Sequence, residues 1–309
     1  MKKALVLGAT GGMGYSLVEE LVGRNIETIA FGRSQQKLQE NKEDWGPLAS
    51  IMVGDALNKN DLKEAISKAD LVFHSINIPY EKWDPTLLTI LTNILEECHS
   101  QNKPFIYVDN IYSYGRHSNL VTEDTQKNPH TKKGNFRLKL INEIKKSGVP
   151  YLIAHFPDFY GPKADNTLLQ YTFEQVLKKG KGGYVGDPTI KREFIYIKDG
   201  ANALVELALR DDTYNESWNI PGASTITGEE ISVIASQYLN KDVKFSKVTK
   251  WMIAMIGIVD PSMREYVEMT YLNETPVILS GSKYEQRIGP VPRTPYEVGV
   301  VNTLISLAK

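Results

Sequence analysis

Three glycines stand three residues apart near the start of the chain, in the run LVLGATGGMGYSLVEELV. An apolar strand is expected to end at Leu7, and a helix with an apolar stripe opens directly after the glycines. Gly8 allows a tight turn, Gly11 lets the backbone approach a diphosphate closely, and Gly14 lets helix and strand pack together. The free N–H groups and positive dipole end of such a helix bind phosphates. The spacing therefore predicts a dinucleotide-binding turn.

The second and third predicted strands supply further candidates for cofactor binding. The strand ETIAF is followed by Arg33 and Ser34, with no carboxylate at its tip. A carboxylate there would bind the ribose hydroxyls of NAD, whereas an arginine can pair with a 2′-phosphate. We therefore expect NADP(H) in preference to NAD(H); the alternative is that Arg33 is a loop residue stacked on adenine. Asp55, after the third strand, either accepts from the adenine amino group or caps the next turn.

The fourth and sixth predicted strands also end where ligands bind in such folds, at the carboxyl edge of the sheet. They end in His74 and Ser75, and in Phe156 followed by Asp158, which either contacts a ligand or forms a turn. His155, inside an apolar strand, is interpreted as a core histidine with a satisfied partner. The expected cofactor-binding residues are Gly8, Thr10, Gly11, Gly12, Met13, Gly14, Arg33, Ser34, Asp55, Ala56, Ser75, Phe156 and Asp158.

Several motifs along nearly the whole chain resemble one superfamily. They are GATGGMG, GDALNKNDL, ADLVFHSI, YVDNIYSYG followed by TED, HFPDFYGP and REFIYIKDGANAL. Together they resemble the short-chain dehydrogenase/reductase superfamily, in its extended or atypical branch, which is similar to NAD-dependent epimerases and dehydratases. The C-terminal run SWNIPGASTITGEEISVIASQYL resembles the substrate lobe of sugar-nucleotide epimerases.

The resemblance also shows where this chain departs from its superfamily. There, a Ser or Thr orients the substrate, a Tyr transfers the proton, and a Lys assists the Tyr and holds the nicotinamide ribose. The matching positions here are Asn110, Lys133 and Arg137. The proton-transfer residues of the superfamily are therefore replaced at all three positions, and their roles cannot be carried over.

Three interpretations of the altered site stay open. Lys133 is the general acid, because burial beside Arg137 and a bound cofactor would ease the loss of its proton. Alternatively a tyrosine donates, with Tyr112, Tyr114 and Tyr160 as candidates. In the third interpretation the substrate or a water supplies the proton. Arg137 stays protonated and can only hold the cofactor ribose or phosphate.

Short apolar runs alternate with amphipathic helical patterns in the first half of the chain. This alternation predicts an α/β fold of the Rossmann type, in which helices cover a doubly wound parallel sheet. We expect the dinucleotide-binding domain to span residues 1–156, with 191–211 returning to it. Residues 157–190 and 212–309 are expected to form a smaller C-terminal α/β lobe that binds the substrate.

The composition excludes several classes of function. The net charge is -1, with 41% hydrophobic and 24% charged residues, which argues against nucleic acid or an anionic membrane as the partner. No metal-ligand spacing is present, so no metal is expected. A single cysteine and the absence of a targeting segment favour the cytoplasm. The run WMIAMIGIV at 251–259 is interpreted as a buried or lid helix, with membrane contact as the alternative.

These patterns favour an NADPH-dependent oxidoreductase that reduces a carbonyl or conjugated small molecule with an atypical proton donor. One alternative is a nucleotide-sugar epimerase or dehydratase, which the C-terminal resemblance favours. The other is a sensor that binds dinucleotide without turning it over, which the loss of the triad favours. The expected partner is a small-molecule substrate, and a homodimer is compatible with the sequence.

Overall fold

The computed structural model describes residues 2–308 and divides the chain into two compact units. The first comprises Met1–Asp109, Phe136–His155 and Gly200–Trp218, and the second comprises Asn110–Asn135, Phe156–Asp199 and Asn219–Lys309. Residues 110–135 and 191–199, which we expected in the dinucleotide domain, are thus grouped with the second unit. The domain boundaries derived from the sequence stay a prediction.

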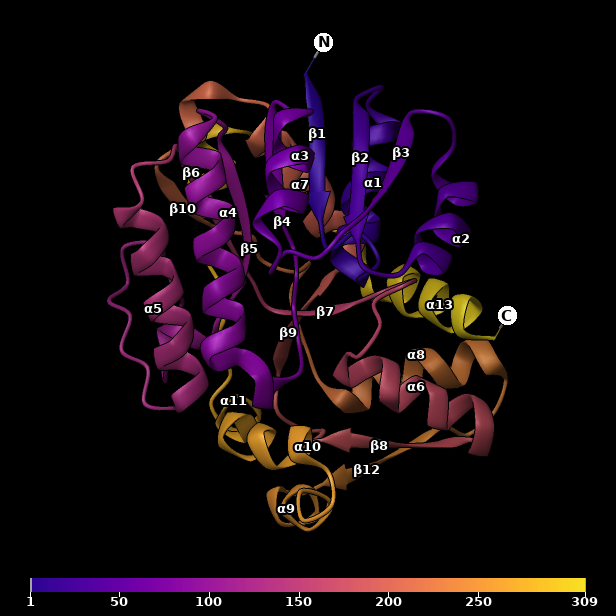
Figure 1. Cartoon of the computed structure of the whole chain (residues 1–309). Helices are drawn as coiled ribbons and strands as arrows, with labels where there is room; N and C mark the ends of the chain where they lie inside the picture. Colours follow the sequence, from indigo (N-terminus) through magenta and orange to yellow (C-terminus); the bar gives the residue numbers. More distant parts are fainter. Residues whose placement is uncertain (1, 309) are drawn as a thin grey trace. The chain divides into compact units, whose positions relative to one another are not determined.

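The first unit is built on a seven-stranded sheet with the order β10-β6-β5-β4-β1-β2-β3 (Figure 1). Its strands are β1 (Lys3–Leu7), β2 (Glu27–Gly32), β3 (Ala49–Val53), β4 (Leu71–His74), β5 (Phe105–Asn110), β6 (Tyr151–Phe156) and β10 (Glu216–Asn219). The pairs β1–β2, β2–β3, β1–β4 and β4–β5 are parallel. Four consecutive residues of β1, from Ala4 to Leu7, are buried, as expected for a strand covered on both faces. The predicted α/β fold of the Rossmann type is confirmed.

Helices cover both faces of this sheet. They are α1 (Gly12–Gly23), α2 (Gln35–Trp45), α3 (Lys59–Ser67), α4 (Leu88–Ser100), α5 (Lys132–Lys146) and α7 (Ile197–Ala208). In Figure 1, α4 and α5 lie in front of the sheet and α1 lies behind it. Arg24, just after α1, donates to the Glu206 carboxylate and to the Asn202 carbonyl of α7, so these two helices lie side by side. None of the helices within residues 2–308 is long and apolar enough to cross a membrane.

The second unit contains a three-stranded sheet, β11-β9-β7, and a parallel pair, β12–β8. Its strands are β7 (Asp158–Tyr160), β8 (Lys181–Val185), β9 (Arg192–Tyr196), β11 (Thr225–Ile226) and β12 (Lys244–Val248). Its helices are α6 (Leu168–Lys179), α8 (Gly228–Leu239), α9 (Lys250–Ile256), α10 (Pro261–Tyr266), α11 (Tyr271–Glu274), α12 (Ser282–Arg287) and α13 (Tyr296–Leu307). Short helical turns include η3 (Tyr112–Tyr114) and η5 (Val267–Thr270).

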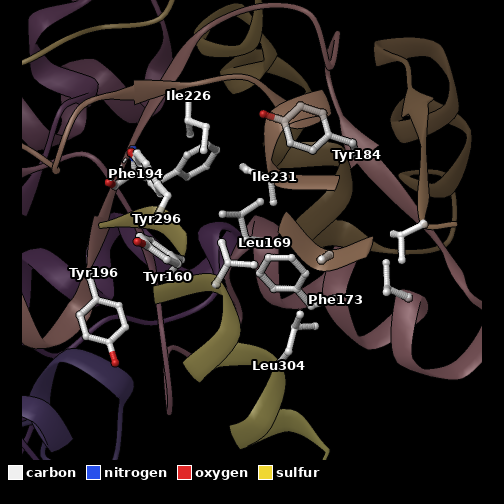
Figure 2. Packing of buried hydrophobic residues seen from close by; sticks show 14 residues of the cluster. Tyr160, Leu169, Phe173, Tyr184, Phe194, Tyr196, Ile226, Ile231, Tyr296 and Leu304 are labelled. Atoms are coloured by element: carbon white, nitrogen blue, oxygen red, sulfur yellow. Dashed lines mark hydrogen bonds between the residues drawn. The ribbon is translucent and has the colours of Figure 1, made fainter. Parts of the chain in front are cut away.

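An aromatic core holds the second unit together, as Figure 2 shows. The rings of Tyr160 and Tyr296 stack with their centres 5.6 Å apart. Tyr296 also accepts from the backbone N–H of Phe194 at 3.1 Å, which ties α13 to β9. The helix α9 does not join this core, because Ile253 is its one buried residue. Of the interpretations of 251–259, the buried helix is therefore wrong, whereas a lid helix and membrane contact stay predictions.

Glu193 is a buried carboxylate that joins three segments of the second unit. It accepts from the backbone N–H of Gly222 at 3.1 Å and of Leu279 at 2.9 Å. Burial raises the pKa of Glu193 to about 7, although both hydrogen bonds oppose the shift. The unfolded chain releases this proton near its ordinary pKa of 4.5. Between these two pH values the folded state binds more protons than the unfolded state.

The stability contributed by Glu193 should therefore fall as the pH rises from about 4.5 to about 7. A shift of this size is linked to a change in the free energy of unfolding of up to about 3 kcal/mol. Glu193→Gln cannot ionise, so its urea-unfolding free energy should lack this decline. The glutamine NH2 group would face a backbone N–H donor, so Glu193→Gln should be less stable than the wild type at every pH. The two proteins are therefore compared by the slope of their unfolding free energy against pH. Parallel slopes for the two proteins would contradict the prediction.

Candidate functional site

The glycine turn after β1 has the backbone geometry that dinucleotide binding requires. Gly8 adopts a positive φ of +89°, and its carbonyl accepts from the Gly11 N–H at 3.0 Å. A Cβ on Gly14 would lie 2.2 Å from the Gly8 carbonyl oxygen and 2.8 Å from Ser75 Oγ. Only glycine allows α1 to approach the end of β1 this closely.

The N-terminus of α1 is left open by its own side chains. Gly11 is the N-cap residue, no side chain accepts from the first turn, and the first turn holds no acidic residue. By contrast, Ser34 caps α2 and Asn58 caps α3. The first N–H groups of an uncapped helix are donors that an anion can satisfy. A Cβ at Gly11 would meet the Gly8 carbonyl oxygen at 3.5 Å and no other atom that close, so the space beside this turn is open. This cradle fits the diphosphate of a dinucleotide.

The ends of the first four strands meet at the same edge of the sheet. A Cβ on Gly32, at the end of β2, would lie 3.4 Å from the Thr10 side chain, and the Gly54 N–H donates to the Gly32 carbonyl at 3.1 Å. Ser75 Oγ donates to the Leu7 carbonyl at 3.0 Å. Gly8, Thr10, Gly11, Gly12, Met13, Gly14, Arg33, Ser34, Asp55, Ala56 and Ser75 are thereby gathered along the carboxyl ends of β1, β2, β3 and β4.

Two of these side chains already serve the local backbone. The Ser34 hydroxyl accepts from the Lys37 N–H at 3.3 Å as the cap of α2. The Asp55 carboxylate accepts from the Leu57 N–H at 3.0 Å. Arg33 is exposed. Asp55 therefore makes the turn-capping contact that was one of its two interpretations. A contact between Asp55 and adenine stays a prediction.

Arg137 lies in a buried polar network of the first unit. Its Nη1 donates to the Tyr107 hydroxyl at 2.7 Å and lies 3.5 Å from Asp109 Oδ1. The guanidinium also sits over the Trp83 ring, 4.3 Å from its centre. Asp109 Oδ2 lies 2.9 Å from His155 Nδ1, so His155 is a buried core histidine with a partner for its Nδ1, as interpreted from the sequence.

Nearby titratable groups are held in their uncharged forms. Burial, followed by the charge of Arg137, lowers the pKa of His74 to about 3. Burial raises the pKa of Tyr107 to about 12, although the adjacent guanidinium favours its ionised form. Arg137 of α5 is therefore a fixed cation beside Tyr107 and Asp109 of β5, and His74 adds no second positive charge there.

Lys133, at the start of α5, is held by two carboxylates of the second unit. Its Nζ forms an ion pair with Glu265 of α10. The backbone N–H groups of Lys132 and Lys133 donate to the two oxygens of Glu268, at 2.8 and 3.0 Å. Lys133 keeps the pKa of Glu265 below its usual range. The neighbour of Lys133 in this unit is therefore an anion, whereas we expected burial beside a second cation.

Asn110 and Tyr112 lie close to the start of α5. Asn110 Oδ1 accepts from the Tyr112 N–H at 3.0 Å, and a Cβ on Gly134 would lie 2.7 Å from the Tyr112 carbonyl. Tyr114 points elsewhere, because its hydroxyl donates to Asn219 Oδ1 at 2.7 Å in a buried position. Asn110, Tyr112 and the Lys133 segment are thus brought together in the second unit, and the Tyr114 hydroxyl has a partner in the fold.

Two predicted site residues, Phe156 at the end of β6 and Asp158 just after it, are packed within the second unit. Asp158 accepts from Nη2 of Arg192 at 2.8 Å, and this arginine is buried with its guanidinium 4.9 Å from the Phe194 ring centre. Phe156 is buried against Phe159, with ring centres 5.2 Å apart. Tyr160 belongs to the aromatic core, and burial raises its pKa. Their contacts with a ligand stay predictions.

Sequence reasoning missed the partners of these residues. Glu265 and Glu268 come from a segment more than a hundred positions beyond Lys133, and Arg192 lies 34 positions beyond Asp158. No motif in the sequence marks either carboxylate as a partner of α5. Within residues 2–308, no group of three or more His, Cys, Asp or Glu side chains is arranged to hold a metal ion.

Comparisons with known proteins place this geometry in context. The model of the "NAD dependent epimerase/dehydratase family" matches residues 4–220. The UDP-N-acetyl-alpha-D-glucosaminuronate decarboxylase of Bacillus cytotoxicus is 23% identical over 276 residues, covering 80% of this chain and 83% of the relative. The UDP-glucuronic acid 4-epimerase of Bacillus cereus, solved in complex with NAD, has a TM-score of 0.82 at 19% identity, covering 99% of this chain and 98% of the other. The dTDP-glucose 4,6-dehydratase of Bacillus anthracis, also in complex with NAD, has a TM-score of 0.81 at 15% identity, covering 100% and 97%.

The expectation of NADP(H) in preference to NAD(H) is wrong. The matching family is described as NAD dependent, and both solved structures named above hold NAD. The error comes from Arg33, whose type was taken to select a 2′-phosphate. An exposed arginine at this edge can equally stack on adenine or donate to ribose hydroxyls, so its presence does not exclude NAD.

The family match and the structure agree on the whole first unit. The matched residues, 4–220, are more than half of the chain, and they include the glycine turn, all but the first residue of the seven-stranded sheet, and Asn110, Lys133 and Arg137. The structural neighbours extend the likeness to the second unit. The chain therefore belongs to the NAD-dependent epimerase/dehydratase family.

Proposed function

We propose that this chain binds NAD at its glycine turn and modifies a nucleotide-linked sugar as an enzyme of the epimerase or dehydratase type. The observation that carries the proposal is the open N-terminus of α1 behind Gly8, Gly11 and Gly14. Support for the substrate class comes from the names of the decarboxylase, the epimerase and the dehydratase above, which act on nucleotide sugars. Reduction with NADPH loses its basis with the correction of the cofactor.

Each part of the proposed NAD site has a physical role. The first N–H groups of α1 bind the diphosphate, and the missing side chain of Gly11 leaves room for it. Arg137 supplies a permanent charge and N–H donors for ribose oxygens, and Tyr107 and Asp109 keep its guanidinium in place. NAD, when bound, supplies the hydride acceptor and donor.

The proton is assigned to the ammonium group of Lys133. This residue stands at the position of the superfamily tyrosine, and Glu265 pairs with its Nζ. When a sugar oxygen gains negative charge, an N–H bond of Lys133 breaks and an O–H bond forms on the sugar. The neutral amine left beside Glu265 then takes a proton from solvent.

Lys133→Met is expected to lower kcat at least a hundredfold and to leave the Kd for NAD nearly unchanged. Lys132→Met is the matched control, because Lys132 is exposed beside it and carries the same charge. The nucleotide released from the purified chain is first identified. Turnover is then measured with UDP-glucose, UDP-glucuronic acid and dTDP-glucose. Turnover that survives in Lys133→Met would exclude Lys133 as the donor, and a chain that binds no NAD would exclude the whole proposal.

A second candidate function is NAD binding without turnover. It is favoured by the ion pair at Lys133 and by the Tyr114 hydroxyl, which is committed to Asn219. Neither group matches the tyrosine that the superfamily uses. This candidate predicts NAD in the purified chain, no product from any of the three sugars, and no effect of Lys133→Met on any measured property except stability.

A further inference from the structure

The segment 250–268 of the second unit buries very little of itself. It contains α9, the turn after it, α10 and the first half of η5. Ile253 and Gly257 are the two buried residues of this segment, which the structure describes throughout. The chain is better anchored on either side, because β12 pairs with β8 before the segment and residues 269–273 are all buried after it. Segments with few buried contacts open at a lower free energy than the core does.

The helices α9 and α10 pack on each other and form a hairpin, 250–266. A Cβ on Gly257 would lie 2.8 Å from the Cα of Arg264, so the end of α9 lies directly against α10. The Asp260 carboxylate between them caps α10, accepting from the N–H groups of Ser262 and Met263 at 2.8 and 3.3 Å. In Figure 1 the two helices lie together just beyond β12. The hairpin can therefore move as one body.

Two carboxylates fasten this part of the chain to the start of α5. Glu265 of α10 pairs with Nζ of Lys133, and Glu268 of η5 accepts from the backbone N–H groups of Lys132 and Lys133. The side chain of Lys133 has an exposed fraction of 9%, whereas Lys132 beside it is exposed. The proposed proton donor is thus covered, and the helix that carries its partner is weakly rooted.

We propose that the α9–α10 hairpin is a lid over Lys133, and that the ion pair between Glu265 and Lys133 is its latch. The inference rests on the proposed function, because it concerns the access of a sugar to the proposed donor. The lid opens when Glu265 and Lys133 separate, which lets a sugar oxygen reach the Nζ. It then closes again, with Glu265 beside the ammonium group.

The exposure of Glu265 keeps the cost of opening low. Its side chain has an exposed fraction of 29%, so water already reaches one partner of the ion pair. Such a pair contributes less than one that is shielded from water on both sides.

The alternative is a fixed brace that supports the start of α5. A brace would need a firm base in the second unit. The aromatic core of this unit, however, has no member within 250–268. Of the two buried residues in the segment, Ile253 alone has a side chain to pack. The contacts of the hairpin therefore favour a lid over a brace.

Hydrogen exchange of the full chain tests the lid. Backbone amides of α9 and α10 should exchange faster than those of α8, which packs on the aromatic core through Ile231 and Ala235. Glu265→Gln should speed exchange in both α9 and α10 by about fivefold, because the latch is lost and the two helices move together. Exchange in α8 should not change, which shows that the variant stays folded. Glu274→Gln is the matched control, since it removes the same charge from an exposed position on α11.

Acetylation of the lysines gives a second, local measurement. Sulfosuccinimidyl acetate modifies accessible amines, and fragment masses distinguish Lys132 from Lys133. In the wild type, Lys133 should react about tenfold more slowly than Lys132, because closed molecules cover it. In Glu265→Gln this difference should shrink, and in Glu274→Gln it should persist. Loss of a neighbouring carboxylate by itself also makes an amine more reactive, so the labelling is judged together with the exchange.

Two outcomes would overturn the lid. Equal labelling of Lys132 and Lys133 in the wild type would mean that nothing covers Lys133. Unchanged exchange in α9 and α10 of Glu265→Gln, even with faster labelling, would mean that the hairpin is a fixed brace. Neither measurement needs a substrate. If both give the expected results but none of the three sugars is turned over, the proposed function fails and the lid over Lys133 stands.

Discussion

Gly14→Ala is expected to abolish NAD binding and to lower the free energy of unfolding by about 3 kcal/mol. The added Cβ would lie 2.2 Å from the carbonyl oxygen of Gly8, a backbone atom that cannot rotate away. The start of α1 must therefore move from the end of β1. This movement breaks the close packing of helix and strand, and it displaces the N–H groups that are proposed to bind the diphosphate.

Two other glycines of the same segment separate binding from folding. A Cβ on Gly11 would lie 3.5 Å from the Gly8 carbonyl, an ordinary contact, so Gly11→Ala should fold normally. Its methyl group would occupy the space in front of the α1 N-terminus, and the affinity for NAD should fall at least tenfold, or about 1.4 kcal/mol. A Cβ on Gly23 would meet nothing within 4 Å, so Gly23→Ala should bind like the wild type and be equally or more stable.

Isothermal titration with NAD and urea unfolding are measured on all three variants. The expected order is loss of both properties in Gly14→Ala, loss of affinity alone in Gly11→Ala, and loss of neither in Gly23→Ala. If Gly14→Ala bound NAD with wild-type affinity, the turn would not be the dinucleotide site. If Gly11→Ala bound normally while Gly14→Ala was merely unstable, the glycines would serve packing alone.

The sheet of the first unit was predictable because each of its signals is local. Apolar runs such as KALVL mark strands buried on both faces, and the glycine turn marks where the first helix must begin. The Rossmann-type order follows from the general rules for parallel strands joined by helices. The exposure of α9 was not predictable in this way, because an apolar run looks the same whether or not anything covers it.

The partners at the altered triad positions were beyond sequence reasoning for a different reason. The spacing of KGNFR identifies Lys133 and Arg137, but it says nothing of the side chains they contact. Glu265 is 132 positions away from Lys133, and a lone glutamate in a helix carries no signal of its partner. A residue type alone was also misleading at Arg33, where the same guanidinium suits either dinucleotide. Tertiary contacts decided the case of Lys133, and the comparisons with known proteins decided the case of Arg33.

Arg137→Met should lower the free energy of unfolding by about 3–5 kcal/mol. The side chains of Arg137 and Asp109 have exposed fractions of 6% and 0%, so their ion pair is shielded from water. Without the guanidinium, the Asp109 carboxylate stays buried with His155 as its remaining partner in the network. The variant also loses the contact with the Trp83 ring and the hydrogen bond to Tyr107. Leaving a buried charge uncompensated is the largest of these costs.

Arg24→Met is the matched control for this experiment. Arg24 also pairs with carboxylates, those of Glu20 and Glu206 at 2.7 and 2.6 Å, but its side chain has an exposed fraction of 25%. Water screens such a pair, so its loss should cost about 1 kcal/mol. Urea unfolding of both variants gives the comparison. If both variants lost the same free energy of unfolding, burial would not make the Arg137 ion pair more important for stability than the Arg24 pairs.

A double variant tests whether the cost comes from the stranded carboxylate. Asp109→Asn removes the charge and keeps the shape, so Arg137→Met combined with Asp109→Asn should recover about 1–2 kcal/mol relative to Arg137→Met alone. No recovery would place the cost in the lost packing against Trp83 and in the lost hydrogen bond to Tyr107. Recovery would mean that the Asp109 carboxylate holds the Arg137 guanidinium in place, and that this carboxylate is left buried without its cation when the guanidinium is removed. In that case, a neutral substitution of Arg137 should destabilise the chain, and this loss of stability would mask any role of Arg137 in NAD binding. Arg137→Lys keeps the charge and is the better test of that role.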